Sequence, residues 1–506
     1  MMTAIPGEAT VAVVGAGTMG AGIAQLAATA GHRVLLFDSR ADAAAEAIAG
    51  IARRLESSVE KGRRSAAEVQ AILSRLQAAS SLADLAPAAL VIEAVVEDLA
   101  VKRELFAALE KIVGERTILA TNTSSLSITA LAAGLSRPGR VVGMHFFNPA
   151  PVMPLVEIVS GLETETGVAE TAFHTAQAWG KEPIHVRNTP GFVVNRVARP
   201  FYGEGFRLLA EGAADAATLD ALYRDCGGFR MGPFELVDLI GLDVNLAVTR
   251  SVFAACHFDR RYTPSPLQEE MVAAGRLGRK TGRGFYDYGE GGERPEPASE
   301  PDGPVPAEIT VEGHLGPAEP LLDLAREAGI AVRWQPHGPG LVHLGETVLL
   351  MTDGIAASEH AARQGRPVVT FDLCLDFTTA GRIAIAAADR CQPAHLAAAA
   401  GLFRALGKKV TRIADLPGMV VMRTLAMLAN EAADLAHHGI AEPEAIDLAM
   451  RKGVNYPRGP LDWARKIGWL RILECLDHLA RSYGEERYRC SLWLRQRLWQ
   501  EAHRHG

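Results

Sequence analysis

Apolar positions at the start of the chain predict a strand, a helix and a second strand in close succession. Residues 10–14 form a short apolar run rich in β-branched residues, which is typical of a strand buried in a parallel sheet. Residues 21–30 are rich in alanine and predict a helix, and residues 33–37 predict the next strand, which ends at Asp38. The segment GAGTMG, residues 15–20, joins the first strand to the helix. This order predicts a βαβ unit at the start of a parallel sheet.

The glycines of this segment and Asp38 indicate a dinucleotide site. Gly15 permits a tight turn, Gly17 lets the backbone approach a pyrophosphate, and Gly20 lets the helix pack closely on the strand. The N-terminus of the helix presents free N–H groups and the positive end of its dipole to the phosphates. Asp38 can accept hydrogen bonds from the ribose hydroxyls of the adenosine, and its charge disfavours the 2′-phosphate of NADP. The pattern therefore predicts NAD as the cofactor.

Polar residues follow the later predicted strands of the same sheet. Residues 140–144 form an apolar run that leads directly into His145, and residues 155–159 form the next predicted strand, which contains Glu157. Oxidation of an alcohol by NAD requires a base for the hydroxyl proton, and a histidine with a carboxylate partner suits that role. His145 and Glu157 are therefore the candidate base and its partner. The spacing alone leaves open a structural histidine and a glutamate that is paired elsewhere.

Composition excludes several other classes of protein. The net charge of −7 lacks the basic excess of a nucleic-acid-binding surface. No apolar run approaches the ~18 residues of a membrane span, and the N-terminus lacks the features of a signal peptide. The six cysteines are scattered without CxxC spacing, which argues against a disulfide framework and against a metal site. We expect a cytoplasmic protein of several domains, because 506 residues exceed the usual size of one domain.

Seven segments between residues 10 and 288 together resemble the 3-hydroxyacyl-CoA dehydrogenase family. They are VVGAGTMGAGIAQ, IEAVVEDLAVKRELF, TNTSSLSI, GMHFFNPAPVMPLVE, TPGFVVNRV, MGPFELVDLIGLD and GRLGRKTGRGFYDY. The resemblance implies a Rossmann domain that binds NAD, followed by an all-α C-terminal domain. It also implies the reaction, which is the oxidation of the 3-hydroxyl of a coenzyme A thioester to a ketone.

The resemblance implies roles for individual residues of this chain. His145 resembles the catalytic base and Glu157 its partner, while Ser124 and Asn195 resemble the residues that hydrogen-bond the reacting substrate. Lys61 lies in a run of residues 53–64 that is rich in Lys and Arg, and it falls where the family's helical excursion meets the phosphates of coenzyme A. Without the resemblance, such a basic run is commonly a solvated helix face. The residues that line the NAD site are then Gly15, Gly17, Thr18, Met19, Gly20, Asp38, Glu97, Lys102, Ser124, Asn148 and Lys280.

The second half of the chain contains an internal repeat. Residues 417–423, PGMVVMR, mirror residues 190–196, PGFVVNR, at an offset of 227. An ungapped comparison of residues 190–241 with 417–468 gives 15 identities in 52 positions. Further upstream, Ala30-Gly31 aligns with the Ala-Gly pair at 328–329, at an offset of 298. We therefore expect a second, degenerate copy of the whole unit; the alternative is that only the helical part is duplicated.

The second copy does not keep the candidate site residues. At these two offsets it has different chemistry at the aligned positions: Asp372 for His145, Leu375 for Asn148, Ala384 for Glu157, Met422 for Asn195, Leu315 for Gly17, Ala318 for Gly20 and Pro336 for Asp38. The predicted organisation is a Rossmann domain (1–187), a helical domain (188–288), a Gly/Pro-rich acidic linker (289–307), a degenerate Rossmann-like segment (308–414) and a second helical domain (415–506).

The long form with two helical copies resembles bacterial members of the family that oxidise 3-hydroxyadipyl-CoA in phenylacetate catabolism. A dicarboxylate thioester requires a cation at the far end of the acyl pocket, for which Arg230 and Arg199 are candidates, with a surface or structural arginine as the alternative. One rival is a 3-hydroxybutyryl-CoA dehydrogenase of fatty-acid or butanoate metabolism. Others are a dehydrogenase of small β-hydroxy acids with a lysine base and a catalytically inactive NAD-binding structural protein.

The second copy also suggests how the chain is assembled. Shorter members of the family pair through their helical domains. We hypothesise that the second copy packs on residues 190–288 and replaces a partner subunit, which gives an internal pseudo-dimer. A homodimer of the whole chain stays open at this point.

Overall fold

The computed structural model of the protein describes residues 3–505, with side chains described through residue 500. The chain forms two compact units, and each is built from two segments of the sequence. The first unit comprises Met1–Arg196 and His438–Val454, and the second comprises Val197–His437 and Asn455–Gly506. The first therefore contains the predicted βαβ unit, and the second contains the other sheet and most of the helices.

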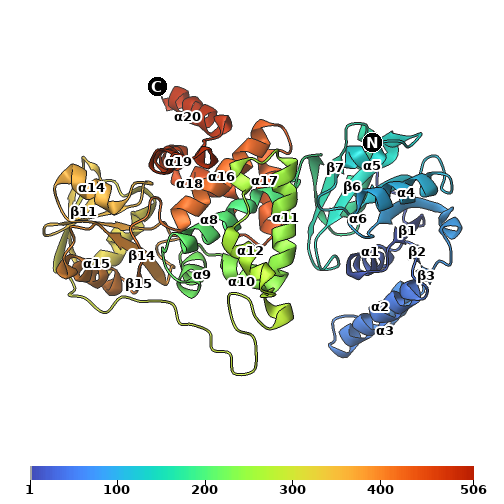
Figure 1. Cartoon of the computed structure of the whole chain (residues 1–506), viewed down its shortest axis with the longest axis horizontal. Helices are drawn as coiled ribbons and strands as arrows, with labels where there is room; N and C mark the ends of the chain where they lie inside the picture. Colours follow the sequence, from blue (N-terminus) through green and yellow to red (C-terminus); the bar gives the residue numbers. More distant parts are fainter. Residues whose placement is uncertain (1–2, 506) are drawn as a thin grey trace. The chain divides into compact units, whose positions relative to one another are not determined.

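The first unit is built on a sheet that contains the strands predicted around the dinucleotide site (Figure 1). Its strands lie in the order β3-β2-β1-β4-β5-β6-β7-β8, and all neighbours run parallel except β6 and β7. The order reverses between β1 and β4, which is where open α/β sheets bind ligands. The strands are β1 (Thr10–Val14), β2 (Val34–Phe37), β3 (Leu76–Ala78), β4 (Ala88–Glu93), β5 (Ile118–Thr121), β6 (Val141–Phe146), β7 (Leu155–Ser160) and β8 (Glu182–Arg187).

Helix α1 packs directly on β1 and β2, because small residues line the helix. Ile23, Ala24 and Ala27 of α1 are completely buried together with Val11 and Val13 of β1. This packing fixes the N-terminus of α1 at the end of β1. The helices of the first unit are α1 (Thr18–Thr29), α2 (Ala43–Glu60), α3 (Ala66–Leu73), α4 (Leu99–Glu110), α5 (Ile128–Ala132), α6 (Thr166–Ala178), α7 (Val194–Val197, whose last residue lies in the second unit) and α17 (Pro443–Gly453).

Helix α17 belongs to the first unit although it comes from the second helical segment of the sequence. It packs on β7 and on the edge strand β8. The N–H of Arg187 in β8 donates to the carbonyl of Ile440 over 2.8 Å, and Lys452 forms an ion pair with Glu182 over 2.8 Å. These contacts cover the β8 edge of the sheet, where backbone N–H and C=O groups would otherwise be left unpaired.

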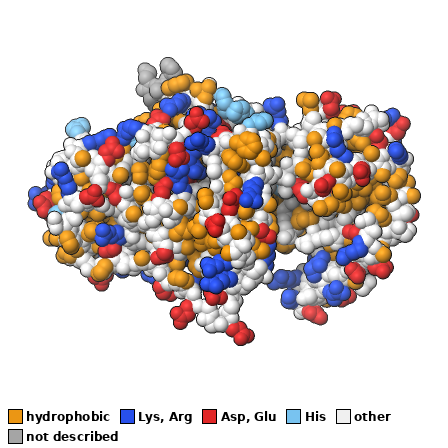
Figure 2. All heavy atoms as spheres, in the orientation of Figure 1, with side chains coloured by type: hydrophobic (Ala, Val, Ile, Leu, Met, Phe, Trp, Pro, Cys, Tyr) orange, Lys and Arg blue, Asp and Glu red, His pale blue; other side chains and the backbone are white. Residues whose placement is uncertain are grey.

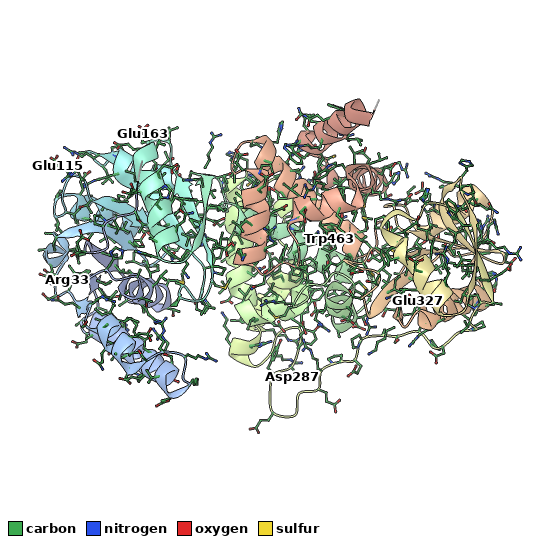
Figure 3. All side chains as sticks on the ribbon, turned by 180° about the vertical axis from the view of Figure 1, so that it is seen from behind. Arg33, Glu115, Glu163, Asp287, Glu327 and Trp463 are labelled. Carbon is green, nitrogen blue, oxygen red and sulfur yellow. The ribbon has the colours of Figure 1, made fainter. Side chains whose placement is uncertain are left out.

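The helical part of the second unit differs from the sequence prediction at one point. The sequence predicts one helix from residue 193 to about residue 211 within the helical domain, but the helix is interrupted at Ala198 between α7 and α8. Pro200 explains the interruption, because it has no N–H to donate to the carbonyl of Arg196. Trp463 of α18 is buried in this helical part (Figure 3). The α-helices here are α8 (Arg199–Ala210), α9 (Ala216–Asp225), α10 (Pro233–Ile240), α11 (Leu242–Ala255), α12 (Pro266–Ala273), α16 (Val421–His437), α18 (Pro460–Ile467), α19 (Trp469–Tyr483) and α20 (Leu492–His505).

A second sheet in the second unit confirms that the duplication extends beyond the helical part. Its order is β10-β9-β11-β12-β13-β14-β15. Strand β9 begins at Glu308, which is 298 residues after Thr10, the first residue of β1. The alternative of a helical duplication alone is therefore wrong. The strands are β9 (Glu308–Gly313), β10 (Ala331–Gln335), β11 (Pro339–Leu344), β12 (Thr347–Met351), β13 (Val368–Phe371), β14 (Arg382–Ala387) and β15 (Lys409–Arg412), with helices α13 (Pro320–Glu327), α14 (Ala357–Gln364) and α15 (Pro393–Ala405).

The second sheet has a shorter path across its centre than the first. In the first sheet β1 pairs directly with β4, and the two strands are parallel. In the second sheet β9 pairs with β11, which is antiparallel to β9 and continues through a short turn into β12. Strands β11 and β12 take the places of β4 and β5 in the strand order, so a hairpin replaces the βαβ crossover in which α4 connects β4 to β5. The second copy is shorter than the first by 71 residues, the difference between the two offsets of 298 and 227, and this replacement accounts for part of that difference.

The predicted linker is an extended chain without helix or strand, and most of its residues are exposed (Figure 1). It begins just beyond Asp287, which is labelled in Figure 3. Its second half is nevertheless held in place. The N–H of Ala298 donates to Thr218 of α9, the carbonyl of Ala298 accepts from Arg382 and Thr411, and the N–H of Glu300 donates to the carbonyl of Val410. The linker is therefore attached along the second sheet rather than free in solvent.

Candidate active site

The glycine segment forms the turn that was predicted between β1 and α1. Gly15 has a φ of +102°, and a Cβ on Gly20 would lie 1.8 Å from the carbonyl oxygen of Gly15. Side chains at these two positions are therefore excluded. A Cβ on Gly17 would meet nothing within 4 Å, and no described side chain caps the N-terminus of α1 there. Free N–H groups at a bare helix N-terminus fit the pyrophosphate of a dinucleotide.

Asp38 lies directly after β2 and beside this turn. Its Oδ2 accepts the N–H of Ala16 over 2.7 Å, and its Oδ1 accepts the N–H of Arg40 over 2.9 Å. The carboxylate therefore fixes the glycine turn in addition to the ribose contact that was predicted from the sequence. This second role could not be predicted from the sequence, because it depends on how closely β1 and β2 lie.

Glu97 organises the turn that follows β5. Its Oε1 accepts the hydroxyl of Thr123 over 2.6 Å and the N–H of Ser124 over 3.0 Å. Burial opposes ionisation of Glu97, but Lys102 at 3.2 Å and these hydrogen bonds outweigh burial and lower its pKa. Asn195 donates through Nδ2 to the carbonyl of Ser124 over 3.4 Å. Four of the predicted residues, Glu97, Lys102, Ser124 and Asn195, are thus brought together.

Glu93 is a residue of this region for which the sequence analysis assigned no role. It is fully buried at the end of β4 and accepts the ammonium of Lys102 over 2.6 Å. It also accepts the hydroxyl of Thr121 over 2.7 Å and the N–H of Val95 over 2.6 Å. The available signal was a single acidic residue inside an apolar strand, nine residues before a lysine. Such a carboxylate requires a buried cation.

His145 and Glu157 face each other across the antiparallel pair β6 and β7. The Nδ1 atom of His145 lies 2.6 Å from Oε2 of Glu157, and both side chains are buried. The rings of Phe147 and Phe192 pack against the imidazole, with centroids at 4.5 and 5.8 Å. Because Nδ1 is held by the carboxylate, Nε2 is the ring atom that can take up a proton.

The other oxygen of Glu157 binds the backbone. Its Oε1 accepts the N–H groups of Val193 and Val194 over 3.0 and 2.9 Å. These residues lie at the start of α7, which contains Asn195. One carboxylate therefore holds the histidine with one oxygen and the start of the helix that contains Asn195 with the other.

The second copy satisfies the same backbone groups by a different residue. Asp372, which aligns with His145, accepts the N–H groups of Val420, Val421 and Met422 over 2.9, 2.7 and 3.1 Å. Val420 and Val421 align with Val193 and Val194 at the offset of 227. Burial raises the pKa of Asp372 to about 6. The second copy thus keeps the carboxylate acceptor for its helix but has no histidine to orient.

The other predicted residues lie apart from this cluster or in the second unit. Asn148 is exposed beyond β6, and Lys61 is exposed at the end of α2. Figure 2 shows Lys and Arg side chains gathered over α2 and the turn after it, and the residues of this patch are Arg53, Arg54, Lys61, Arg63 and Arg64. In the second unit, Lys280 pairs with Asp243 over 2.5 Å, and Arg230 is exposed between α9 and α10.

Among the residues that the structure describes, no group of three or more His, Cys, Asp or Glu side chains could hold a metal ion. None of the described helices is both long and apolar enough to span a membrane.

Comparison with known families agrees with the two-copy architecture. The NAD-binding domain of 3-hydroxyacyl-CoA dehydrogenase matches residues 10–189. The C-terminal domain of 3-hydroxyacyl-CoA dehydrogenase matches twice, over residues 191–288 and 418–505. The reduced Rossmann-fold domain of 3-hydroxybutyryl-CoA dehydrogenase matches residues 349–417, in the second sheet.

Individual relatives cover either the whole chain or its first half. The 3-hydroxyadipyl-CoA dehydrogenase of Escherichia coli K12 is 46% identical over 97% of this chain and 98% of its own length. A crystal structure of 3-hydroxybutyryl-CoA dehydrogenase from Escherichia coli K12 is 44% identical, with a TM-score of 0.90 over 98% of this chain and 99% of that one. The (S)-3-hydroxybutyryl-CoA dehydrogenase of Ralstonia eutropha is 43% identical, with a TM-score of 0.54 over 55% of this chain and 99% of that one.

Replacing Glu157 or Asp372 by alanine is expected to destabilise the unit that contains it by about 2–4 kcal/mol, because two or three buried N–H groups lose their acceptor. Hydrogen exchange should accelerate at residues 193–194 in the first variant and at 420–422 in the second. Asp376→Ala is the matched control, since Asp376 is exposed. Unchanged protection of these amides in the alanine variants would contradict this account of the two carboxylates.

Proposed function

The chain belongs to the 3-hydroxyacyl-CoA dehydrogenase family, and on that basis we propose that its substrate is 3-hydroxyadipyl-CoA, oxidised in phenylacetate degradation. The reaction itself is the family's, the oxidation of the 3-hydroxyl of a 3-hydroxyacyl-CoA to the 3-oxo compound with NAD. The observation that supports the reaction is the buried His145–Glu157 pair at 2.6 Å. The observation that supports the substrate is the 46% identity to a 3-hydroxyadipyl-CoA dehydrogenase over both full lengths.

The residues of the site divide the chemistry between them. Nε2 of His145 takes the proton of the 3-hydroxyl, and Glu157 stabilises the imidazolium that results. Ser124 and Asn195, which contact each other, hold the substrate's oxygen atoms. When bound, NAD supplies the acceptor for the hydride that leaves C3. Phe147 and Phe192 exclude water from one side of the imidazole.

The remaining predicted residues keep the roles that the family resemblance implies. Lys61 would meet the phosphates of coenzyme A, and the exposed basic patch around it supports this role. Gly15, Gly17, Thr18, Met19 and Gly20 would hold the pyrophosphate, and Asp38 the ribose. Asn148 and Lys280 would complete the NAD site, together with Glu97 and Lys102.

A 3-hydroxybutyryl-CoA dehydrogenase is the second candidate. The structure with a TM-score of 0.90 to this chain has that name, although it also has the long form. The catalytically inactive alternative from the sequence analysis is unsupported, because the His145–Glu157 pair and the glycine turn are both intact. Acyl-chain preference therefore decides between two active enzymes.

His145→Ala is expected to lower kcat by about 10²- to 10⁴-fold, because the base for the hydroxyl proton is removed. The dissociation constant for NAD, measured by fluorescence titration, should change by no more than about twofold, because the glycine turn and Asp38 are unaltered. His174→Ala on α6 is the matched control and should leave kcat unchanged. Turnover of His145→Ala at the rate of the parent protein would exclude this histidine as the base.

The substrate is tested by NADH formation on 3-hydroxyadipyl-CoA and 3-hydroxybutyryl-CoA. We expect kcat/KM to favour the dicarboxylate by about tenfold or more, which corresponds to ~1.4 kcal/mol for a contact with the distal carboxylate. If Arg230 makes that contact, Arg230→Ala should remove most of the preference, whereas Arg276→Ala at another exposed arginine should not. Preference for the four-carbon substrate would support the second candidate, and turnover of neither would overturn the proposed function.

We also propose that the two helical copies form an internal pseudo-dimer. The contacts between them are reciprocal, as in a two-fold interface. The hydroxyl of Tyr262 donates to Glu431 over 2.5 Å, and the hydroxyl of Tyr488 donates to Glu204 over 3.1 Å. Glu204 and Glu431 are 227 positions apart, and Tyr262 and Tyr488 are 226 apart.

The arginines beside these tyrosines repeat the pattern. Arg261 lies 3.5 Å from Glu431, and Arg487 lies 3.3 Å from Glu204, again at a separation of 226. Helices α8 and α16, which contain the two glutamates, pack against each other. The second copy thus provides the contacts that a partner subunit would provide.

Sedimentation equilibrium of the full chain is therefore expected to give the mass of one chain at micromolar concentration. Glu431→Ala, which breaks one half of the reciprocal contacts, should destabilise the protein by about 3 kcal/mol or more because it leaves Arg261 buried without this partner. An obligate dimer joined through residues 190–288 of two chains would overturn the pseudo-dimer.

A further inference from the structure

A cavity of about 200 Å³ lies within the second unit, beside α8 and α11 and the 3₁₀ turns η3 (Arg260–Tyr262) and η6 (Glu486–Tyr488). It is smaller than the ~300–1,000 Å³ clefts that hold drug-sized ligands, so any occupant is small. None of the residues assigned to the NAD or catalytic site lines it. Arg199, one of the two candidates for the distal carboxylate of the substrate, does line it, whereas Arg230, which the proposed function uses, does not.

Four arginines line the cavity, and no aspartate or glutamate does. They are Arg199, Arg207, Arg261 and Arg487. The carboxylates that hold three of them lie behind the wall. Arg207 binds Glu485, Arg261 binds Asp434 and Glu431, and Arg487 binds Glu204. The side chains that an occupant would meet thus include four guanidinium groups, three of which are held in place by carboxylates that do not line the cavity.

Two of these guanidinium groups have a hydrogen-bond donor that the protein does not use. The Nε atoms of Arg261 and Arg487 are buried and have no hydrogen-bond partner among the described residues. The Arg261 side chain is 2% exposed and that of Arg487 is 9% exposed. Both arginines line the cavity, and an acceptor that reached one of these N–H groups would remove the free-energy cost of a buried donor without a partner. Burial also lowers the pKa of Arg199, an effect that a bound anion would oppose.

The rest of the wall is largely apolar. Tyr202, Phe206 and Tyr262 contribute rings, and Pro264 and Pro266 contribute pyrrolidines. Thr249 and Gln268 are among its polar residues, and the hydroxyl of Thr249 accepts from Nη1 of Arg199 over 2.9 Å. A lining that combines arginines with apolar groups suits a carboxylate on a short hydrocarbon chain better than a compact inorganic anion.

We propose that this cavity is a binding site for a small aliphatic carboxylate, separate from the site of hydride transfer. The ligand's carboxylate accepts from the guanidinium groups of Arg261 and Arg487, and its hydrocarbon chain lies against the rings of Tyr202 and Phe206. The site is formed by side chains from both helical copies, since Arg261 comes from the first and Arg487 from the second.

The two copies differ at a position that opens the cavity. Gly203 of α8 lines it, and the aligned residue of α16 is Asn430. Asn430 donates to the carbonyl of Arg489 over 2.9 Å and accepts the N–H of Ser491 over 2.7 Å. A Cβ on Gly203 would lie 3.3 Å from Nη2 of Arg487, at the flexible end of that side chain. Gly203→Asn therefore places in the first copy the side chain that the second copy already has.

The test is isothermal titration of the full chain with three probes: hexanoate, inorganic phosphate and hexanol. Hexanoate should bind with one-to-one stoichiometry and raise Tm by a few degrees at saturation, because it binds only the folded protein. Phosphate and hexanol should each bind about tenfold or more weakly, since each lacks one half of the ligand. Gly203→Asn should weaken hexanoate binding by about tenfold or more, because its side chain occupies the cavity.

Gly381→Asn is the matched control and should leave hexanoate binding unchanged, because Gly381 is exposed and a Cβ there would meet nothing within 4 Å. Thr249→Val serves if Gly203→Asn does not fold, and it should weaken binding by disturbing Arg199. Absence of saturable hexanoate binding, phosphate binding as tight as that of hexanoate, or unaltered binding in the folded Gly203→Asn variant would each overturn the proposal. NADH formation by Gly203→Asn should equal that of the parent protein.

Discussion

The active site depends on the two oxygens of Glu157, which bind two different parts of the chain. One oxygen holds the imidazole of His145, and the other accepts the backbone N–H groups of Val193 and Val194. Because α7 begins at Val194, the same carboxylate fixes His145, the proposed base, and the start of the helix that contains Asn195. Three hydrogen bonds to this buried carboxylate restrict its movement, which favours the fixed geometry that proton transfer requires.

The second copy separates the two tasks of that carboxylate. It has lost the histidine, the glycine turn and the acidic residue after the second strand, yet a buried carboxylate still binds the start of its helix. Asp372 reaches these amides from the position directly after β13, the strand that corresponds to β6, whereas Glu157 reaches them from β7. The second copy thus keeps the buried acceptor that its fold requires and lacks the residues that the chemistry requires. This difference is expected, since unpaired N–H groups in a core destabilise the protein whether or not it catalyses a reaction.

Much of the first unit could be predicted from the sequence because its signals are local. The apolar runs predicted the strands around β1, the glycines predicted the turn, and the pairing of His145 with Glu157 was predicted as well. The catalytic roles of these two residues stay predictions. The roles of Glu93 and Glu97 could not be predicted, because they depend on which strand ends meet. The interruption at Ala198 follows from Pro200, which has no N–H to donate. The antiparallel direction of β11 could not be predicted, because no repeat signal covers this strand. The domain boundaries stay predictions, and so do the contacts of Lys61, Lys280 and Arg230 with ligands.

The assignment of residues 438–454 to the first unit has a consequence for how the chain can be divided. The backbone passes between the two units three times, after residues 196, 437 and 454, so neither unit is a continuous stretch of sequence. A protease that cuts within residues 289–307 would leave two fragments, and the C-terminal fragment would still contribute α17 to the sheet of the N-terminal one. Such a nicked protein would remain one particle under native conditions. For the same reason, a gene shortened to the first half would encode a sheet whose β8 edge lacks the cover that the full chain provides.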